Sequence, residues 1–203
     1  MTIEKDKKKF LRPTQCNMPD LSSLNDKNVL GIVVGFFIGD SPTKYLPKAL
    51  VINFVRTIDQ IVREYENARV ALLEFIKNQP STYVSPYFHA VGYFENLLIH
   101  LKRAVLFIRK IKKNKELTSV IGKVKLNEPI AELIVNIRNA VEHLDSDLVK
   151  GKIPENEPWF LILQNDSLVF KRKKILYKEL ANFIMSLYFI AQNLVRANYG
   201  SQS

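Results

Sequence analysis

Four polar residues in the stretch IRNAVEHLD, Ile137–Asp145, are of types that suit phosphodiester cleavage: Arg138, Asn139, Glu142 and His143. An imidazole, whose ordinary pKa is about 6.5, can accept a proton from a ribose 2′-hydroxyl or donate one to a leaving oxygen at neutral pH. A guanidinium supplies permanent, planar hydrogen-bond donors for phosphate oxygens on which charge develops. Because attack by a 2′-hydroxyl needs no metal ion, these residue types suit metal-independent cleavage of RNA.

Helical spacing sorts this stretch into an apolar face and a polar face. With Ile130 as the origin and about 100° per residue, the apolar side chains fall within about 40° of that origin; they are Ile134, Ile137, Val141, Leu144 and Leu148. The four polar residues fall at about 80° to 220°, so we expect them to point away from the chain's own core. A single helix offers only a shallow site, and a two-fold related copy of the same helix would supply the second wall.

Two of the four polar side chains have more than one interpretation. The amide of Asn139 either fixes the ring of His143 or holds the scissile phosphate. Glu142 either orients His143 or Arg138, or it is a solvated helix residue. A solvated helix face is also the simplest alternative for the whole set, because Arg, Glu and His are common on exposed helices.

A second polar set lies on the preceding helical segment, where Asn96, His100 and Arg103 share the face opposite the apolar stripe. These residues either line the same cleft, contact an RNA backbone or belong to the ordinary surface. Together with Glu142 they are the candidate supporting residues.

The elements that must position these residues are mainly helices. Apolar residues recur at steps of three and four, which predicts long helices over about 46–77, 86–112, 128–150 and 175–197. For the third helix, Asn127 suits the N-cap, Pro129 suits the first turn and Gly151 suits the stop. The aromatic residues at helical spacing are expected in the core, namely Phe54, Phe94, Phe107, Phe183, Tyr188 and Phe189.

Two segments favour strands over helices. The segment WFLILQNDSLVFKRK, residues 159–173, predicts two strands around a turn, and the β-branched, Gly-rich run Val29–Ile38 predicts one short strand. The predicted fold is therefore mainly all-α, an antiparallel up-and-down bundle of about four long helices with a small β-hairpin before the last one. We divide the chain into an extension over residues 1–45, partly disordered with a mobile arm over about the first 25, and a bundle domain over residues 46–199.

Composition narrows the class of protein. The chain has 203 residues, of which 47% are hydrophobic, enough for a full core. Cys16 is the single cysteine, so the chain can form neither an intrachain disulfide nor a Cys-based metal cluster, and a reducing, cytoplasmic setting is favoured. The longest apolar run, Val29–Gly39, is well short of the ~20 residues of a membrane helix. We expect no membrane association, no metal site and no cofactor.

Basic residues are unevenly distributed. The formal net charge is +10, and the segment Lys102–Lys125 holds nine basic residues and only one acid, Glu116. A second cluster, KRKK, covers Lys171–Lys174. Such segments attract polyanions, although a solubilising surface remains the alternative. The residues we expect to contact RNA are Lys110, Lys112, Lys113, Lys171, Arg172, Lys173 and Lys174.

The segment RNAVEH, Arg138 to His143, resembles the signature of HEPN domains, in which an Arg is followed by a polar residue, three further residues and a His. The long helices before and after it, from Pro86 to the end of the last helix, are also similar in arrangement. The resemblance implies a helical bundle that dimerises with its motif helices facing each other. Many such proteins are metal-independent ribonucleases, often toxins or abortive-infection proteins, and some are paired with a nucleotidyltransferase antitoxin. Others are scaffolds or nucleotide-binding modules.

The resulting hypothesis is a cytoplasmic, metal-independent endoribonuclease that leaves 2′,3′-cyclic phosphate ends. Its catalytic residues would be Arg138, Asn139 and His143, in a composite site at a homodimer interface. The expected partners are RNA, a second copy of the chain and an antitoxin protein. The alternative is a non-catalytic scaffold, or a nucleic-acid or nucleotide-binding module, built on the same bundle.

Overall fold

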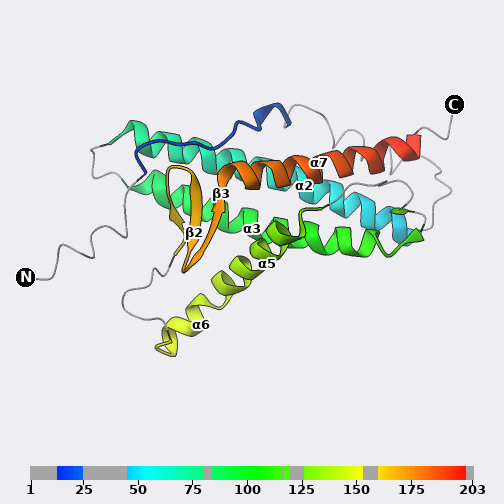
Figure 1. Cartoon of the computed structure of the whole chain (residues 1–203). Coiled ribbons are helices and arrows are strands. Elements are labelled where there is room, and N and C mark those ends of the chain that lie inside the picture. Colours follow the sequence, from blue (N-terminus) through cyan, green and yellow to red (C-terminus); the bar gives the residue numbers. More distant parts are fainter. Residues whose placement is uncertain are drawn as a thin grey trace, which may run out of the picture.

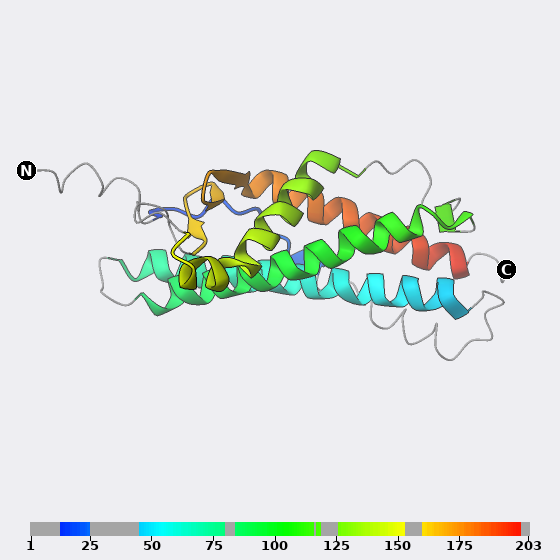
Figure 2. The same cartoon turned by 90° about the horizontal axis from the view of Figure 1, so that it is seen from below.

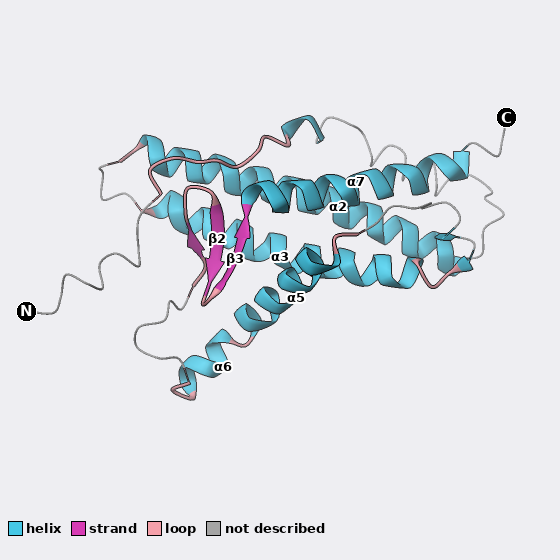
Figure 3. Ribbon diagram, in the orientation of Figure 1, coloured by secondary structure: helices cyan, strands magenta, loops and turns pink. Residues whose placement is uncertain are grey.

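The computed structural model of the chain describes residues 13–24, 45–79, 84–115, 117–118, 126–152 and 160–199. Within these ranges the protein is mostly helical, with five α-helices, a short 3₁₀ helix and a small antiparallel sheet just before the last helix (Figure 1, Figure 3). In chain order the elements are η2 (Ser22–Leu24), α2 (Tyr45–Lys77), α3 (Ser85–Ile111), α5 (Glu128–Glu142), α6 (Leu144–Val149), β1 (Ile162–Leu163), β2 (Ser167–Phe170), β3 (Lys173–Leu176) and α7 (Tyr177–Tyr199). The strand predicted at Val29–Ile38 lies outside the described residues.

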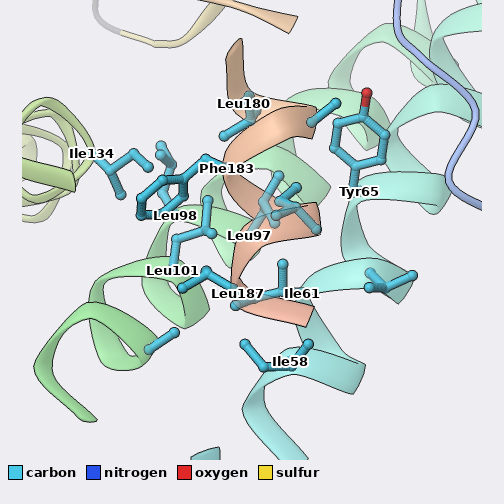
Figure 4. Close-up of a cluster of buried hydrophobic side chains, with 14 of the residues drawn as sticks. Ile58, Ile61, Tyr65, Leu97, Leu98, Leu101, Ile134, Leu180, Phe183 and Leu187 are labelled. Carbon is cyan, nitrogen blue, oxygen red and sulfur yellow. The ribbon is translucent and has the colours of Figure 1, made fainter. Parts of the chain in front are cut away.

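Helices α2, α3 and α7 form the body of the bundle, and α5 crosses it obliquely, in contact with α3 and α7 (Figure 1, Figure 2). Figure 4 shows one cluster of buried side chains to which all four helices contribute, including Ile61, Leu101, Ile134 and Phe183. The predicted apolar stripes are largely confirmed, because their members at the centres of α2, α3 and α7 are buried. None of the helices in the described ranges combines the length and apolar composition needed to cross a membrane.

Helix α5 begins as its sequence predicts. The side chain of Asn127 caps it, accepting a hydrogen bond of 3.3 Å from the N–H of Ile130, and Pro129 lies in the first turn. An Asn cap satisfies one of the backbone N–H groups that the first helical turn leaves without a partner. The buried side chains of α5 are Ile130, Ala131, Ile134 and Ile137.

The predicted continuous helix to Lys150 is wrong in one respect, since it is interrupted at His143, which separates α5 from α6. Val141 and Leu144 are only partly buried, and Leu148 is 42% exposed, so the end of the segment leaves the core and little packing holds it to one straight axis. Gly151 ends α6 as predicted. Its φ of 62° is left-handed, and hydrogen bonds run from Gly151 N to Leu148 O and from the next residue's N to Asp147 O.

The small sheet has three antiparallel strands in the order β1-β2-β3, where two were predicted. The additional strand, β3, pairs Leu168 with Ile175 and Ser167 with Leu176. Alternation along a strand buries Ile175 and leaves Leu176 partly exposed. These two residues belong to β3, whereas the last helix was predicted to begin at about residue 175. The predicted core position of Phe189 is also wrong, because that side chain is exposed on α7.

Residues 13–24 pack against the bundle, which differs from the mobile arm predicted over this part of the chain. Met18 and Leu21 are buried, and the hydroxyl of Tyr65 on α2 donates a hydrogen bond of 3.0 Å to the carbonyl of Pro19. The N–H of Asn17 donates to the carbonyl of Asn165 in the β1–β2 turn at 2.8 Å. Two buried apolar side chains and these backbone hydrogen bonds hold the segment along α2 (Figure 1).

Candidate active site on helix α5

Two of the four motif residues, Asn139 and Glu142, contact one lysine of the neighbouring helix α3. The ammonium of Lys102 donates a hydrogen bond of 2.7 Å to Oδ1 of Asn139 and lies 3.6 Å from Oε2 of Glu142. The same carboxylate oxygen forms an ion pair with Nη1 of Arg138, one helical turn before it. Lys102, Arg138, Asn139 and Glu142 therefore form one connected polar cluster between α3 and α5, which we call the α3–α5 cluster.

The side chains of the α3–α5 cluster differ in how far they are buried. The side chain of Arg138 is 18% exposed and that of Lys102 28% exposed, whereas that of Glu142 is about half exposed. The polar face of α5 is thus not wholly turned away from the chain, because the long stem of Lys102 reaches it from α3. Two cations meet one carboxylate, so the cluster keeps a net positive charge of one at neutral pH. That surplus favours an anionic ligand at this surface.

His143 lies at the break between α5 and α6. It is the last residue held by α5, since its N–H donates to the carbonyl of Asn139 at 3.2 Å. Its side chain is exposed, and among the described residues it has no hydrogen-bond or ion-pair partner. The imidazole is therefore open to solvent, one helical turn beyond Asn139, and no neighbouring group competes with a substrate for its nitrogens.

The second polar set lies on another side of α3. His100 and Lys102 are two residues apart on a helix, which separates them by about 200°, and Lys102 points to α5. Burial lowers the pKa of His100 below its ordinary 6.5; the positive charges of Arg103 and Arg63 act in the same direction, and Glu64 opposes them. Arg63 and Glu64 belong to α2, so His100 faces α2 and not the motif. The structure does not bring it together with His143.

Asn96 and Arg103, like His100, lie away from the motif residues of α5. Both side chains are exposed on α3, and no described contact joins either of them to α5. The Nδ1 atom of His100 is itself buried without a hydrogen-bond partner in the described part of the chain. Of the four supporting candidates, only Glu142 lies within the α3–α5 cluster.

The basic residues predicted to contact RNA lie near both ends of the motif segment. At the start of α5, Lys112 lies 3.4 Å and Arg109 3.5 Å from the carboxylate of Glu128, while Lys110 and Lys113 are exposed. These residues follow one another at the C-terminal end of α3, which carries them to the beginning of the motif helix.

At the other end, Lys171 in the β2–β3 turn lies 3.9 Å from Asp147 of α6. The next residue, Arg172, is exposed, Lys173 is partly buried, and Lys174 lies 3.6 Å from Asp166. The KRKK cluster is thus placed beside the segment that follows His143. Some of its charge is neutralised within the chain, so the exposed Arg172 is its least restrained member.

Lys102 is the residue of the α3–α5 cluster that sequence reasoning did not assign to the site. In the sequence, Lys102 is one of nine basic residues in the segment Lys102–Lys125. It lies 37 positions from Asn139, so no local pattern predicts the contact between them. The sequence offers one weak signal, because Lys102 and Arg103 lie well inside the helix, whereas its other lysine and arginine residues, Arg109 and Lys110, lie in the last turn. No group of three or more His, Cys, Asp or Glu side chains in the described ranges is arranged to hold a metal ion.

Comparison of the chain with models of protein families, with curated proteins and with solved structures finds no match. The resemblance of the segment Arg138 to His143 to the HEPN signature therefore rests on its own residues and on the helices around them.

Proposed function

We propose that the protein is a metal-independent endoribonuclease of the HEPN type that acts on single-stranded RNA. The observation that carries the proposal is the α3–α5 cluster, in which Lys102 of α3 contacts Asn139 of α5 and Arg138 pairs with Glu142. The exposed side chain of His143 follows Asn139 by four residues, at the end of the same helix. Basic segments near both ends of the motif segment support an extended polyanionic ligand over a small neutral one.

The proposed reaction assigns one role to each motif residue. The 2′-oxygen of a ribose attacks the adjacent phosphorus while the bond from phosphorus to the 5′-oxygen breaks, which leaves a 2′,3′-cyclic phosphate and a free 5′-hydroxyl. His143 takes the proton of the 2′-hydroxyl or gives one to the departing 5′-oxygen. Arg138 stabilises the charge that develops on the phosphate oxygens, and Asn139 donates a hydrogen bond to the same group.

A second copy of the chain completes this site in the proposal. One imidazole carries out one of the two proton transfers, and a two-fold related His143 would carry out the other. The apolar surface of α6 supports such a partner, since Leu148 is 42% and Val149 89% exposed close to His143. The proposed homodimer buries this surface and gives the shallow face of α5 its second wall.

The test uses the full chain and a fluorescently labelled single-stranded RNA in excess EDTA. We expect the wild type to produce fragments with 2′,3′-cyclic phosphate ends, identified by mass spectrometry, and His143→Ala to lose this activity. His89→Ala, which changes another exposed histidine, is the matched control and should cleave like the wild type. Equal cleavage by the wild type and His143→Ala would refute the assignment, because the observed cleavage would then not depend on His143.

A cellular role follows from the same proposal. We place the activity in the cytoplasm, where Cys16 stays reduced, and assign it to a toxin or defence protein controlled by an antitoxin protein. Expression of the wild type in a bacterial host should arrest growth, whereas expression of His143→Ala to the same level should not. If the wild type and His143→Ala both arrest growth, the toxicity does not depend on the proposed cleavage, and the assigned cellular role is wrong.

One observation favours a second candidate, a non-catalytic RNA-binding or scaffold protein. The guanidinium of Arg138 is already engaged by Glu142, and the ion pair belongs to a cluster that joins α3 to α5. In that case Arg138 serves the structure of the bundle or the dimer. Arg138→Ala separates the two candidates: the enzyme keeps its dimer and loses cleavage by a far larger factor than RNA affinity, whereas the scaffold loses assembly or binding.

A further inference from the structure

The contact between Lys102 and Asn139 determines which way the amide of Asn139 faces. A lysine ammonium has three donors and no acceptor, so the group it approaches at 2.7 Å must be the amide oxygen. The amide nitrogen is bonded to the same planar carbon as the oxygen but in a different direction, so it is not the atom that Lys102 contacts. Among the described residues this nitrogen has no hydrogen-bond partner, and it is available as a donor on the surface of α5.

An amide held this way differs chemically from a free one. An unrestrained Asn side chain can rotate by about 180° and present either its oxygen or its nitrogen to a ligand. The oxygen would repel a phosphate, whereas the N–H groups would donate to it. Lys102 removes the unfavourable orientation before any substrate arrives, and such preorganisation is what makes a donor effective toward a developing anion.

Lys102 also reaches the guanidinium of Arg138 indirectly. Its ammonium lies 3.6 Å from the carboxylate oxygen of Glu142 that pairs with Arg138. Because Lys102 and Arg138 are mostly buried, water screens this set of charges less than it would on an open surface. One side chain of α3 thus restrains both phosphate-directed residues of α5.

We propose that Lys102 is a positioning residue of this site, which turns the Asn139 amide so that its N–H groups donate to a non-bridging phosphate oxygen of RNA. The inference rests on the proposed ribonuclease function and goes beyond it, because it names a residue outside the motif and the donor that this residue orients. The competing explanation is that the contacts of Lys102 only stabilise the packing of α3 against α5.

Four variants distinguish a positioning role of Lys102 from a purely structural one. Lys102→Met keeps much of the apolar stem but removes the donor, and Lys102→Arg keeps both donor and charge. Asn139→Ala removes the oriented amide, and the double variant Lys102→Met/Asn139→Ala removes both groups. The matched control is Glu128→Gln, which breaks the other ion pairs between α3 and α5, those with Arg109 and Lys112, and leaves the α3–α5 cluster intact.

The measurements are kcat and KM for single-stranded RNA in EDTA, with the melting temperature of each variant as a folding check. We expect Lys102→Met to lower kcat at least tenfold and to change KM much less, because it disturbs an interaction made in the transition state. Lys102→Arg should restore most of kcat, and Glu128→Gln should leave kcat unchanged. In the background of Asn139→Ala, the further change Lys102→Met should have little effect, since the group that it positions is gone.

The outcomes separate this inference from the proposed function. If the wild type does not cleave RNA, both are overturned. If the wild type cleaves and Lys102→Met cleaves equally well, only the role of Lys102 is overturned. A loss of kcat in Lys102→Met that multiplies with the loss in Asn139→Ala also overturns positioning, because the two side chains would then act independently. Should Lys102→Met fail to fold, Lys102→Ala replaces it in the same comparison.

Discussion

The backbone N–H of Leu21 donates a hydrogen bond of 2.6 Å to Oε1 of Glu66, a carboxylate buried on α2. The other oxygen of this carboxylate accepts from Nε of Arg69 at 2.9 Å, and Arg69 continues to Asp20 at 2.7 Å. This small network joins the N-terminal segment to the longest helix of the bundle. A buried carboxylate is tolerated there because its oxygens have donors from both sides.

Removal of the Glu66 carboxylate should therefore destabilise the whole bundle. In Glu66→Ala the buried N–H of Leu21 loses its acceptor and Arg69 loses one of its partners, so we expect a loss of about 2–3 kcal/mol in the free energy of unfolding. Urea denaturation measures this loss. Glu66→Gln keeps an acceptor for Leu21 and should cost less, and Glu74→Ala, on the exposed side of the same helix, is the control. Equal stability of Glu66→Ala and Glu74→Ala would contradict the structural role of residues 13–24.

The N-cap of the motif helix gives a smaller and more local prediction. Asn127→Ala removes the acceptor for the N–H of Ile130 and should cost about 1 kcal/mol of unfolding free energy. Asn127→Ser should retain most of the stability because a hydroxyl also caps helices. The control is Asn136→Ala in the exposed middle of α5, where alanine favours the helix and no loss is expected. If Asn136→Ala lowers the free energy of unfolding as much as Asn127→Ala does, the loss in Asn127→Ala is not due to the N-cap.

His100 makes the stability of the fold depend on pH. Its pKa is lowered in the folded chain, chiefly by burial, so the unfolded chain binds a proton more readily. The contribution of this group is therefore favourable above its unfolded pKa and is lost as the pH falls below about 6.5. We expect the urea midpoint to fall between about pH 7.5 and about pH 5.5, and to fall less in His100→Gln. The same pH dependence in both proteins would show that His100 has no such effect.

Two exposed acidic residues, Asp20 and Asp166, do not contribute to the pH dependence of stability between about pH 5.5 and about pH 7.5. Hydrogen bonds from Ser22 lower the pKa of Asp20 below its ordinary 3.8, and a hydrogen bond from Ser167 does the same for Asp166. Both carboxyl groups therefore stay ionised above about pH 5, and their protonation affects stability only in more acidic solution.

Glu142 provides a prediction about RNA binding. Glu142→Gln removes the negative charge that Arg138 and Lys102 now share, so the surface of α5 gains one net positive charge. We expect tighter binding of single-stranded RNA at low salt and a salt dependence steeper by up to about one unit in the plot of log K against log salt. Fluorescence anisotropy over a range of salt concentrations measures both. Glu74→Gln makes the same charge change on α2, which α3 separates from α5 (Figure 2), and a similar gain there would mean that the effect is non-specific.

The helices and their buried faces were predictable because they depend on local spacing. Phe54 on α2, Phe94 on α3 and Phe183 on α7 are aromatic residues at helical spacing, and all three are buried as predicted. The residues that begin and end helices also act locally, which is why the start of α5 at Asn127 and the end of α6 at Gly151 agree with the prediction. The register of Arg138 on α5 follows from the same periodicity.

Errors occurred where distant contacts override local pattern. Leu176 fits a helical repeat, but pairing with Ser167 across the sheet makes it part of β3. Met18 and Leu21 lie in a polar segment whose composition suggested mobility, yet two apolar side chains and a buried carboxylate suffice to hold it. Phe189 follows the aromatic spacing of α7, but no other element covers that side of the helix in the described part of the chain.

Residue types and helical periodicity are properties of neighbouring positions, and they were enough to predict a basic, mainly helical protein with Arg138, Asn139 and His143 on one amphipathic segment. The contacts of Lys102 with Asn139 and Glu142, the position of His100 beside α2 and the break at His143 became visible only in the folded chain. These relationships depend on which helices pack together and where the core ends. Packing of α3 against α5 brings residues far apart in the chain within hydrogen-bond distance, and no local pattern encodes that distance.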